Sequence, residues 1–333
     1  MDDNDHSLVD SYGRVIRKLR LSVIDKCNFR CNFCMPDDPE WLANESVFTI
    51  SEIQRVVRIL ANLGVNRVRV TGGEPLVRKD IVELVRSLAE VPGLKRLGMT
   101  TNGYYLEEKA GALREAGLYS ITVSLHSLRA SRFFGITKRD AFAKVLKGLT
   151  TAKDAGFENV KLNTVIIRGY NDDEIIDFAE VARSQGLVVR FIEYMPFDGK
   201  KMWEETKVVS GKEILEKISS RFEVEPLERE PGSTSMNYRF VEGNGEFGII
   251  TSISKPFCGD CDRIRMTADG KFVPCLFSNQ QYDLAPLVRG GASDDMISKF
   301  FSSNLKLKSP GVEHLIRENQ ALHHVRPMYV TGG

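Results

Sequence analysis

The chain has 333 residues, of which 42% are hydrophobic and 27% are charged, so it is long enough for one large domain or two ordinary ones around a substantial core. Its formal net charge is +1, which excludes a global positive field that would attract nucleic acid or a membrane surface. No stretch approaches the roughly 18 apolar residues that a membrane-spanning helix needs.

The chain begins with an acidic segment, residues 1–6, which lacks the basic-then-apolar pattern of a secretory signal. We therefore expect a reducing cytoplasm, where thiols bind metals more often than they form disulfides. The six cysteines could instead form three disulfides, but their even number comes without a secretory context.

Short β-rich runs alternate with amphipathic segments over the first two thirds of the chain. Strands are expected at residues 19–24, 67–70, 96–100, 120–125, 160–166 and 188–193. Helices are expected at residues 51–63, 81–89, 106–116, 141–155 and 174–184, with Ser51 as the N-cap of the first. This alternation predicts a parallel sheet, either an incomplete barrel or an open doubly wound sheet, with ligands at the carboxyl ends of the strands.

The first cysteine group follows the first expected strand. Its spacing is C-x3-C-x2-C, and its members are Cys27, Cys31 and Cys34. Polar or glycine-rich motifs also follow the other strands, at residues 71–75, 100–103, 124–127 and 193–196. These motifs are expected to meet at one end of the sheet, whereas Lys161 lies early in the fifth strand.

The alternation of expected strands and helices ends after about residue 196. A helix is expected at residues 212–222 and a hairpin at residues 237–241 and 247–252, followed by a less regular tail that ends in Gly332-Gly333. A second cysteine group precedes this tail, with the spacing C-x2-C-x13-C at Cys258, Cys261 and Cys275.

Three thiolates cannot complete a four-ligand metal site, so each cysteine group leaves one coordination position open for a cofactor or substrate. Three thiols within eight residues suit three corners of a [4Fe–4S] cluster. A zinc knuckle completed from elsewhere is the alternative, but zinc sites more often show a fourth Cys or His nearby.

At this point two motifs resemble the radical S-adenosylmethionine superfamily: the C-x3-C-x2-C group after the first strand, and Gly72-Gly73-Glu74-Pro75 after the second. The run from Phe257 through Cys275 narrows the resemblance to the MoaA-type GTP 3′,8-cyclases of molybdenum cofactor biosynthesis. This similarity covers nearly the whole chain, from the first cysteine group to the final Gly-Gly.

The resemblance implies an incomplete (β/α)6 TIM-like barrel with a C-terminal α+β extension over its open side. We expect residues 1–225 to form the barrel and residues 226–333 to form the extension. Two [4Fe–4S] clusters and S-adenosylmethionine are the implied cofactors, and all six cysteines are the implied cluster ligands. The implied reaction converts GTP to (8S)-3′,8-cyclo-7,8-dihydro-GTP, the first step of the pathway.

The family pattern also implies individual contacts. Those with S-adenosylmethionine are Phe33, Gly73, Ser124 and Met195, and Glu74 is placed to accept from its ammonium group. Those with GTP are Arg20, Arg69, Thr100, Lys161, Arg263, Ile264 and Arg265, of which Arg263 and Arg265 are the candidate catalytic residues. Arginine forks suit phosphate oxygens, and a near-neutral protein needs such a local cluster to hold a triphosphate.

Two positions depart from the family pattern. Many members have tyrosine where this chain has Phe33, and many have aspartate where it has His126. The first departure removes a hydroxyl beside the cofactor, and the second changes the hydrogen bonding behind it and its sensitivity to pH.

The implied partners are GTP, a reducing electron donor and, as the next enzyme of the pathway, cyclic pyranopterin monophosphate synthase. A homodimer is compatible with the sequence, and the terminal Gly-Gly is expected to reach into the active site. The alternatives are a radical maturase of a peptide or other small molecule with one auxiliary cluster, a non-catalytic iron–sulfur electron carrier, and a zinc-binding scaffold.

Overall fold

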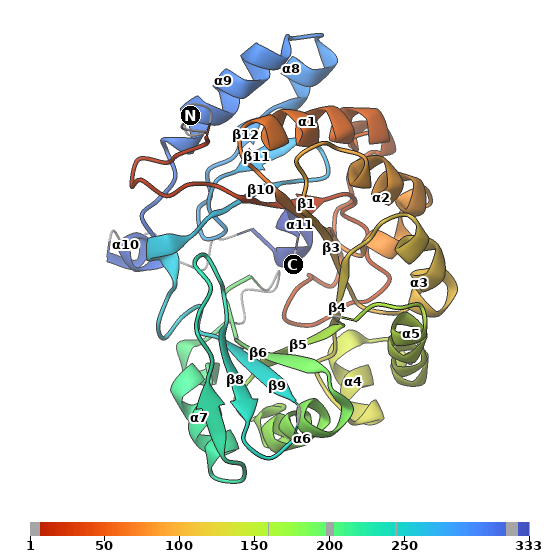
Figure 1. Ribbon diagram of the computed structural model, residues 1–333, viewed down its shortest axis with the longest axis vertical. Coiled ribbons are helices and arrows are strands. Elements are labelled where there is room, and N and C mark those ends of the chain that lie inside the picture. Colours follow the sequence, from red (N-terminus) through yellow and green to blue (C-terminus); the bar gives the residue numbers. More distant parts are fainter. Residues whose placement is uncertain (1–6, 159, 198–202, 244, 318–325, 333) are drawn as a thin grey trace.

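The computed structural model describes residues 7–158, 160–197, 203–243, 245–317 and 326–332. The acidic start at residues 1–6 and the terminal Gly333 lie outside these ranges. Over the described part, the central feature is one open sheet of twelve strands in the order β12-β11-β10-β1-β2-β3-β4-β5-β6-β9-β8-β7. Figure 1 shows this sheet curving so that its strands surround the middle of the molecule.

Six consecutive parallel strands form the centre of the sheet. They are β1 (Lys18–Ser22), β2 (Arg67–Thr71), β3 (Arg96–Thr101), β4 (Ser120–Ser124), β5 (Lys161–Ile166) and β6 (Val188–Glu193). The predicted strands are therefore confirmed, with ends that differ by at most two residues. Their spatial order equals their sequence order, as expected for β/α units in series.

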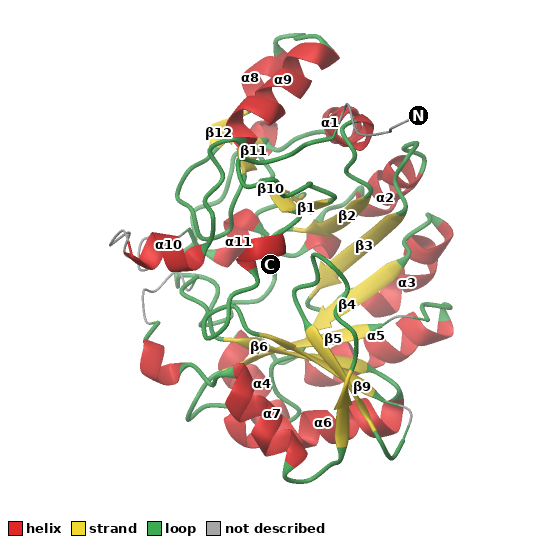
Figure 2. Cartoon of the chain, turned by 60° about the vertical axis from the view of Figure 1, so that its left-hand side comes forward, coloured by secondary structure: helices red, strands yellow, loops and turns green. Residues whose placement is uncertain are grey.

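Helices cover the convex face of the sheet (Figures 1 and 2). Those between the central strands are α1 (Ile50–Asn62), α2 (Ile81–Ala89), α3 (Leu106–Glu115), α4 (Ala130–Thr137), α5 (Phe142–Asp154) and α6 (Ile175–Gln185). Five of them were predicted, and α4 was not. None of the helices described is long and apolar enough to cross a membrane.

The segment after β6 extends the sheet at both edges. At one edge β9 pairs parallel with β6, and at the other edge β10 pairs parallel with β1. The added strands are β7 (Val224–Pro226), β8 (Met236–Phe240), β9 (Glu246–Ile250), β10 (Arg263–Met266), β11 (Lys271–Val273) and β12 (Tyr282–Asp283). The predicted hairpin is confirmed as β8 and β9, which are antiparallel.

The helices of this segment are α7 (Gly211–Ser219), α8 (Ala285–Arg289), α9 (Asp294–Leu305), α10 (Val312–Arg317) and α11 (Met328–Thr331). The tail was predicted to be less regular, but it contains α9, a helix of three turns that the Ser293 side chain caps by accepting from the Met296 N–H. Figure 1 shows α11 inside the curve of the sheet.

Aromatic packing joins the added strands to the central ones. Phe191 of β6 is fully buried, and its ring meets the edge of Phe178 from α6 and of Phe247 from β9 at centroid separations of 6.4 and 6.1 Å. Such pairs stabilise beyond the area that they bury. The hydrophobic layer behind the sheet is thus continuous from the central strands into the added edge.

The N-cap of α1 is Thr49, so the prediction of Ser51 was wrong. The Thr49 hydroxyl accepts from the Glu52 N–H, and the Glu52 carboxylate accepts from the Thr49 N–H at 2.7 Å. This reciprocal pair is a capping box, which satisfies two backbone donors at once. Ser51 lies too late in the turn to form it.

Replacing Thr49 with alanine removes this box, and we expect it to lower the free energy of unfolding by about 1 kcal/mol. Urea denaturation followed by far-UV circular dichroism measures this. The matched control is Thr151→Ala, because the Thr151 hydroxyl only donates back to the Lys147 carbonyl within α5. An equal loss in both variants would contradict the assignment of the cap.

Candidate active site

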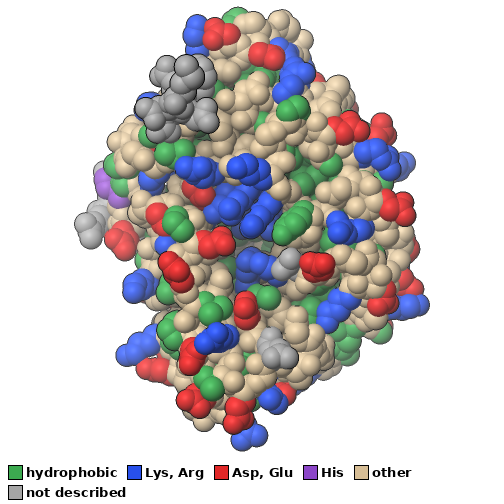
Figure 3. All heavy atoms as spheres, viewed as in Figure 1, with side chains coloured by type: hydrophobic (Ala, Val, Ile, Leu, Met, Phe, Trp, Pro, Cys, Tyr) green, Lys and Arg blue, Asp and Glu red, His purple; other side chains and the backbone are tan. Residues whose placement is uncertain are grey.

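One cavity lies inside the curve of the sheet, and both cysteine groups form part of its wall. The strand-end motifs predicted to converge do so here. The predicted site residues in the wall are Arg20, Phe33, Gly73, Glu74, Thr100, Ser124, Met195, Arg263, Arg265 and all six cysteines. Figure 3 shows Lys and Arg side chains gathered over the middle of one face, where the molecule is hollowed.

Three predicted residues are not part of this wall: Arg69, Lys161 and Ile264. The Ile264 side chain is 1% exposed and belongs to the hydrophobic core, which leaves only its backbone to meet a ligand. Arg69 and Lys161 lie close to the cavity-wall residues Arg20 and Arg190, since these cations act on one another electrostatically.

Parallel register explains why the arginines are neighbours. Arg20 of β1 is paired in register with Arg69 of β2 on one side and with Arg265 of β10 on the other. Residues in register on parallel strands point to the same face of the sheet. The next strand carries Gly98 opposite Arg69, and a Cβ built there would lie 3.0 Å from Arg69 Cζ. The glycine therefore makes room for this guanidinium, which donates to Thr122 Oγ1 at 3.1 Å.

Sequence reasoning missed Arg190 of β6, which also lines the cavity. Its Nε is buried and has no hydrogen-bond partner within the described residues. The available signal was a charged residue in the middle of a β-rich run, the same pattern that marks Arg20 and Arg69. We call Arg20, Arg69, Lys161, Arg190 and Arg265 the cationic cluster.

The cationic cluster is only partly neutralised by the described residues, since Glu230 and Glu246 act electrostatically on Lys161 without forming an ion pair with it. Over the described ranges, no carboxylate forms an ion pair with any of its five members, although the rest of the protein contains many such pairs. Burial, with a contribution from neighbouring guanidiniums, lowers the pKa of Arg20 to about 10, of Arg69 to about 9 and of Lys161 to about 8. Partly desolvated cations that form no ion pair favour a multiply charged anion.

The first cysteine group lies in the loop after β1. The loop turns back at Cys31, whose carbonyl accepts from the Cys34 N–H at 3.1 Å. Burial raises the pKa of Cys27 and of Cys34 to about 12, and nearby negative groups add to both shifts. Buried thiols that resist ionisation on their own suit a ligand that supplies positive charge, as an iron–sulfur cluster does.

The two glycines after β2 pack against the backbone of the neighbouring loop. A Cβ at Gly72 would lie 2.3 Å from the Ile24 carbonyl oxygen, and a Cβ at Gly73 would lie 2.2 Å from that of Asp25. The loop therefore packs directly on the backbone that leads into the first cysteine group. Close approach to this backbone, rather than to a ligand alone, requires glycine here.

Glu74 is 1% exposed and holds the ends of two strands together. Its Oε1 accepts from the Leu76 N–H and from the Thr101 hydroxyl, and its Oε2 accepts from the Asn102 N–H at 2.6 Å. Burial raises its pKa to about 7. Because a carboxylate has about four acceptor positions, Oε2 can still accept from one further donor.

The two departures from the family pattern touch each other. The Phe33 and His126 rings meet edge to face, with centroids 4.7 Å apart. His126 is 8% exposed, and its Nδ1 accepts from the Val165 N–H at 3.1 Å. The two substitutions thus form one contact within the cavity wall.

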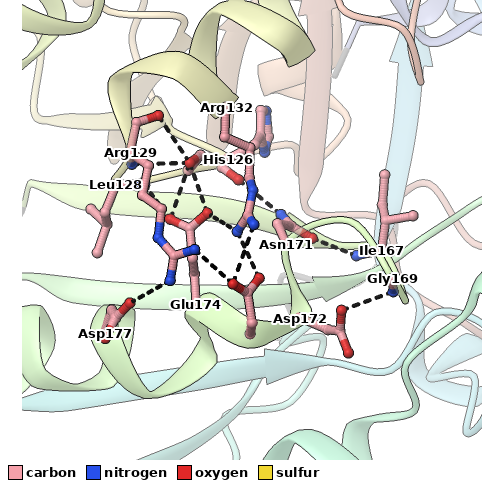
Figure 4. A network of polar contacts seen from close by, with 12 residues as sticks. His126, Leu128, Arg129, Arg132, Ile167, Gly169, Asn171, Asp172, Glu174 and Asp177 are labelled. Carbon is pink, nitrogen blue, oxygen red and sulfur yellow. Dashed lines mark hydrogen bonds and ion pairs between the residues drawn. The ribbon is translucent and has the colours of Figure 1, made fainter.

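A buried carboxylate fixes the loop that carries His126 (Figure 4). Glu174 is fully buried and accepts from the Ser127 hydroxyl at 2.8 Å, from the Leu128 N–H at 2.6 Å and from Arg132. Asn171 donates to the His126 carbonyl at 2.8 Å. These bonds hold the end of β4, so that Ser124 keeps its place in the wall.

The second cysteine group is held by a short turn and by β10. The Cys261 N–H donates to the Cys258 carbonyl at 3.2 Å, and Cys275 lies after β11. Burial raises the pKa of Cys258 and of Cys275. For Cys261, burial acts in the same direction, but Arg263 and Lys308 outweigh it and its pKa is lowered.

All six cysteines are free thiols, so the disulfide alternative is wrong. Within the described ranges, no three Cys, His, Asp or Glu side chains converge tightly enough to hold one metal ion. A four-iron cluster makes a different demand, because each of its thiolates binds a different iron. Two groups of three thiols on the wall of one cavity fit two such clusters.

The C-terminal segment enters the same cavity. Met328 and Tyr329 form part of its wall, and the Gly332 carbonyl accepts from Arg265 Nη1 at 2.5 Å. A Cβ at Gly332 would lie 2.4 Å from Thr71 Cγ2, so only glycine fits beside the end of β2. The expectation that the tail reaches the site is confirmed as far as Gly332.

Comparison with known families divides the chain into two matched regions. Residues 21–182 match the model described as the Radical SAM superfamily, and residues 187–314 match the model described as Molybdenum Cofactor Synthesis C.

Curated relatives cover most of the chain. It is 45% identical to the GTP 3′,8-cyclase of Aquifex aeolicus over 280 residues, which are 83% of this chain and 87% of that one. It is 42% identical to the GTP 3′,8-cyclase of Moorella thermoacetica over 308 residues, covering 92% and 95%. It is 38% identical to the mitochondrial GTP 3′,8-cyclase of Arabidopsis thaliana over 328 residues, covering 98% and 83%.

Among solved structures, the chain resembles Streptococcus suis SuiB bound to S-adenosylmethionine. The TM-score is 0.65 at 15% sequence identity, and the match covers 96% of this chain and 78% of that one. At this identity the likeness extends to the fold.

His126 makes the stability of the protein depend on pH. Burial lowers its pKa to about 4, below the value of about 6.5 expected for an unfolded chain. The unfolded state therefore binds a proton that the folded state does not, and this contribution, full above pH 6.5, is lost as the pH falls toward 4. In urea denaturation, we expect the wild type to lose about 2 kcal/mol more than His126→Asn between pH 7 and pH 5.

Asparagine suits this test because its side-chain oxygen can accept from the Val165 N–H without titrating. Parallel profiles for the wild type and His126→Asn would show that His126 is not buried in its neutral form.

Proposed function

The chain belongs to the radical SAM superfamily and, within it, to the GTP 3′,8-cyclases, and from this premise we propose how its own residues serve the reaction. The enzyme converts GTP to (8S)-3′,8-cyclo-7,8-dihydro-GTP, the first step of molybdenum cofactor biosynthesis. The observation that carries the mechanism is the cationic cluster, whose members form no ion pair with a described carboxylate and lie at the cavity that both cysteine groups line.

The cationic cluster binds the triphosphate. Guanidinium groups donate two parallel hydrogen bonds to phosphate oxygens, and the negative charge of the nucleotide compensates the buried positive charge. Arg20, Arg69 and Arg265 are neighbours in register, so they can donate hydrogen bonds to adjacent phosphates. Lys161 and Arg190 complete the site from β5 and β6, and Thr100 adds a hydroxyl from β3.

S-adenosylmethionine belongs at the carboxyl ends of β1 to β6, beside Cys27, Cys31 and Cys34. There Phe33 and Met195 offer apolar contact, Gly73 and Ser124 offer polar contact, and the free acceptor position of Glu74 suits an ammonium group. When bound, S-adenosylmethionine and this [4Fe–4S] cluster supply a 5′-deoxyadenosyl radical. The wall limits side reactions, because apolar residues such as Ile192 and Phe277 exclude water.

Cys258, Cys261 and Cys275 would hold a second [4Fe–4S] cluster, whose open coordination position would be available to the guanine end of GTP. Arg263 and Arg265 follow this site in β10 and line the cavity, so they would face substrate held between the two clusters, and Ile264 between them would contribute its backbone. We assign both arginines as catalytic residues that stabilise negative charge as the product forms. Fixed orientation matters because a radical can attack several nearby atoms.

The architecture fits a partial TIM-like barrel in residues 1–225 with an extension in residues 226–333. The extension supplies strands to both edges of the curved sheet, which keeps the second cysteine group facing the first. The free thiols favour a reducing compartment such as the cytoplasm. The reaction also needs an electron donor, and its product passes to cyclic pyranopterin monophosphate synthase. A homodimer is compatible with these features.

The maturase alternative draws support only from fold likeness, since SuiB is 15% identical. The decisive test is anaerobic reconstitution with iron and sulfide, followed by dithionite, S-adenosylmethionine and GTP. About eight irons, GTP-dependent 5′-deoxyadenosine and a cyclised nucleotide are expected. Cleavage of S-adenosylmethionine that leaves GTP unchanged would refute the cyclase function.

Arg190 gives a test of the phosphate site. Because a hydrogen bond between charged groups contributes about 1.5–3 kcal/mol, we expect Arg190→Met to weaken GTP binding roughly 10- to 100-fold. Equilibrium dialysis without reductant measures this binding, and the affinity for S-adenosylmethionine should not change.

Arg183→Met is the matched control, because Arg183 pairs with Glu180 on the outer helix α6 at 2.8 Å. It should bind GTP as the wild type does. If Arg190→Met also bound GTP normally, or lost both ligands equally, Arg190 would have no specific role at the phosphates.

A further inference from the structure

A buried lysine lies behind the second cysteine group. Lys308 follows α9, is only 3% exposed and was not singled out by the sequence. Its Nζ lies 2.8 Å from the Arg263 carbonyl oxygen, 3.3 Å from the Cys261 carbonyl oxygen and 3.7 Å from Cys261 Sγ. Fully buried lysines are rare unless they are paired, so this position needs an explanation.

The three contacts indicate that Lys308 is an ammonium group. An ammonium has three N–H donors and no lone pair, which matches three acceptors. A neutral amine would have only two donors and would turn its lone pair toward one of the acceptors. The site is therefore built around a positive charge that touches a cysteine sulfur.

No carboxylate balances this charge within the described residues. The nearby acidic group is Asp10, which is itself 2% exposed and already binds Arg14 at 2.6 Å. Arg14 in turn donates to the Cys258 and Pro310 carbonyls at 2.8 Å and to the Ser309 carbonyl at 2.9 Å. These bonds fix the chain directly after Lys308 and bring a second cation toward the cysteine group.

The surroundings of the first cysteine group are different. There the Glu74 carboxylate acts electrostatically on Cys27, and Arg30, which donates to the Cys27 carbonyl at 2.8 Å, acts in the opposite direction. The surroundings of the two cysteine groups thus differ in charge: a carboxylate and a guanidinium of opposite sign act on Cys27, whereas the cations Arg14, Arg263 and Lys308 act on Cys261. Reduction adds a negative charge to a cluster, so a buried cation favours the reduced state and a carboxylate opposes it.

We propose that Lys308 is a positioning residue for the C-terminal cluster: its ammonium group holds Cys261 and raises the reduction potential of that cluster above that of the N-terminal one. The proposal rests on the second cluster assigned in the proposed function. The thiolates that would bind this cluster carry negative charge, and this charge would balance the ammonium group of Lys308.

The test uses the full-length protein reconstituted with both clusters. Midpoint potentials are measured by redox titration with electron paramagnetic resonance, and the two signals are assigned by comparison with Cys34→Ala protein. In Lys308→Met, we expect a roughly tenfold loss in the ratio of reduced to oxidised C-terminal cluster, a shift of about 59 mV to lower potential for one electron. The N-terminal cluster should keep its potential and serves as the internal reference.

Two further variants separate charge from packing. Lys308→Arg keeps the charge and should keep the potential close to that of the wild type. Lys306→Met removes an exposed lysine two residues away, whose Nζ donates only to the Val9 carbonyl, and should change nothing. If Lys308→Met loses the C-terminal cluster while Lys308→Arg retains it, the role of the charge is also supported.

Two results would overturn the proposal. Full iron content in Lys308→Met with an unmoved C-terminal potential would refute the role of Lys308 while leaving the cyclase function intact. Loss of the cluster in both Lys308 variants would show that packing, not charge, is needed. Wild-type protein that loads only about four irons would instead refute the second cluster itself, and GTP turnover measured on the same sample tells this failure apart.

Discussion

The constraint on which the site depends is positive charge held inside a parallel sheet, where no carboxylate of the described residues forms an ion pair with the cationic cluster. Removing a charged group from water is unfavourable, so these side chains must be held by structure that is stabilised elsewhere. The register of β10, β1 and β2 puts Arg265, Arg20 and Arg69 side by side, and the hydrophobic layer behind the sheet keeps those strands in place. In the proposed function, binding of a triphosphate relieves the repulsion that remains between these cations, which gives the unfavourable arrangement a use.

The extension matters because it joins both edges of the sheet. β9 continues the sheet from β6, while β10 continues it from β1, so the segment spans the opening from one side to the other. As a result, cysteines separated by more than two hundred residues line one cavity. The same arrangement lets the C-terminal tail lie beside the end of β2, where Arg265 binds the Gly332 carbonyl.

The charges around the two cysteine groups differ, with both signs near Cys27 and three cations near Cys261, and this difference arises from the packing of distant segments. Glu74 braces the ends of β2 and β3 beside the first group, whereas Lys308 and Arg14 come from opposite ends of the chain to the second. Similar cysteine triplets are thereby given different electrostatic surroundings. Contacts around the ligands of a metal centre influence its affinity and its redox potential.

The sequence by itself determined the order of strands and helices and the two cysteine groups, because hydrophobic periodicity and ligand spacing are local properties of the chain. It predicted Ser51 as the cap of α1, whereas the structure has Thr49. Both residues carry a hydroxyl and precede Glu52 closely, so the sequence alone does not show which of them forms the capping box. Only the tertiary structure decided that Gly98 makes room for Arg69, that Phe33 contacts His126, that Arg190 joins the cationic cluster and that Lys308 lies against Cys261. Each of these contacts joins different strands or segments, and its position is determined by register and packing, which no local pattern encodes.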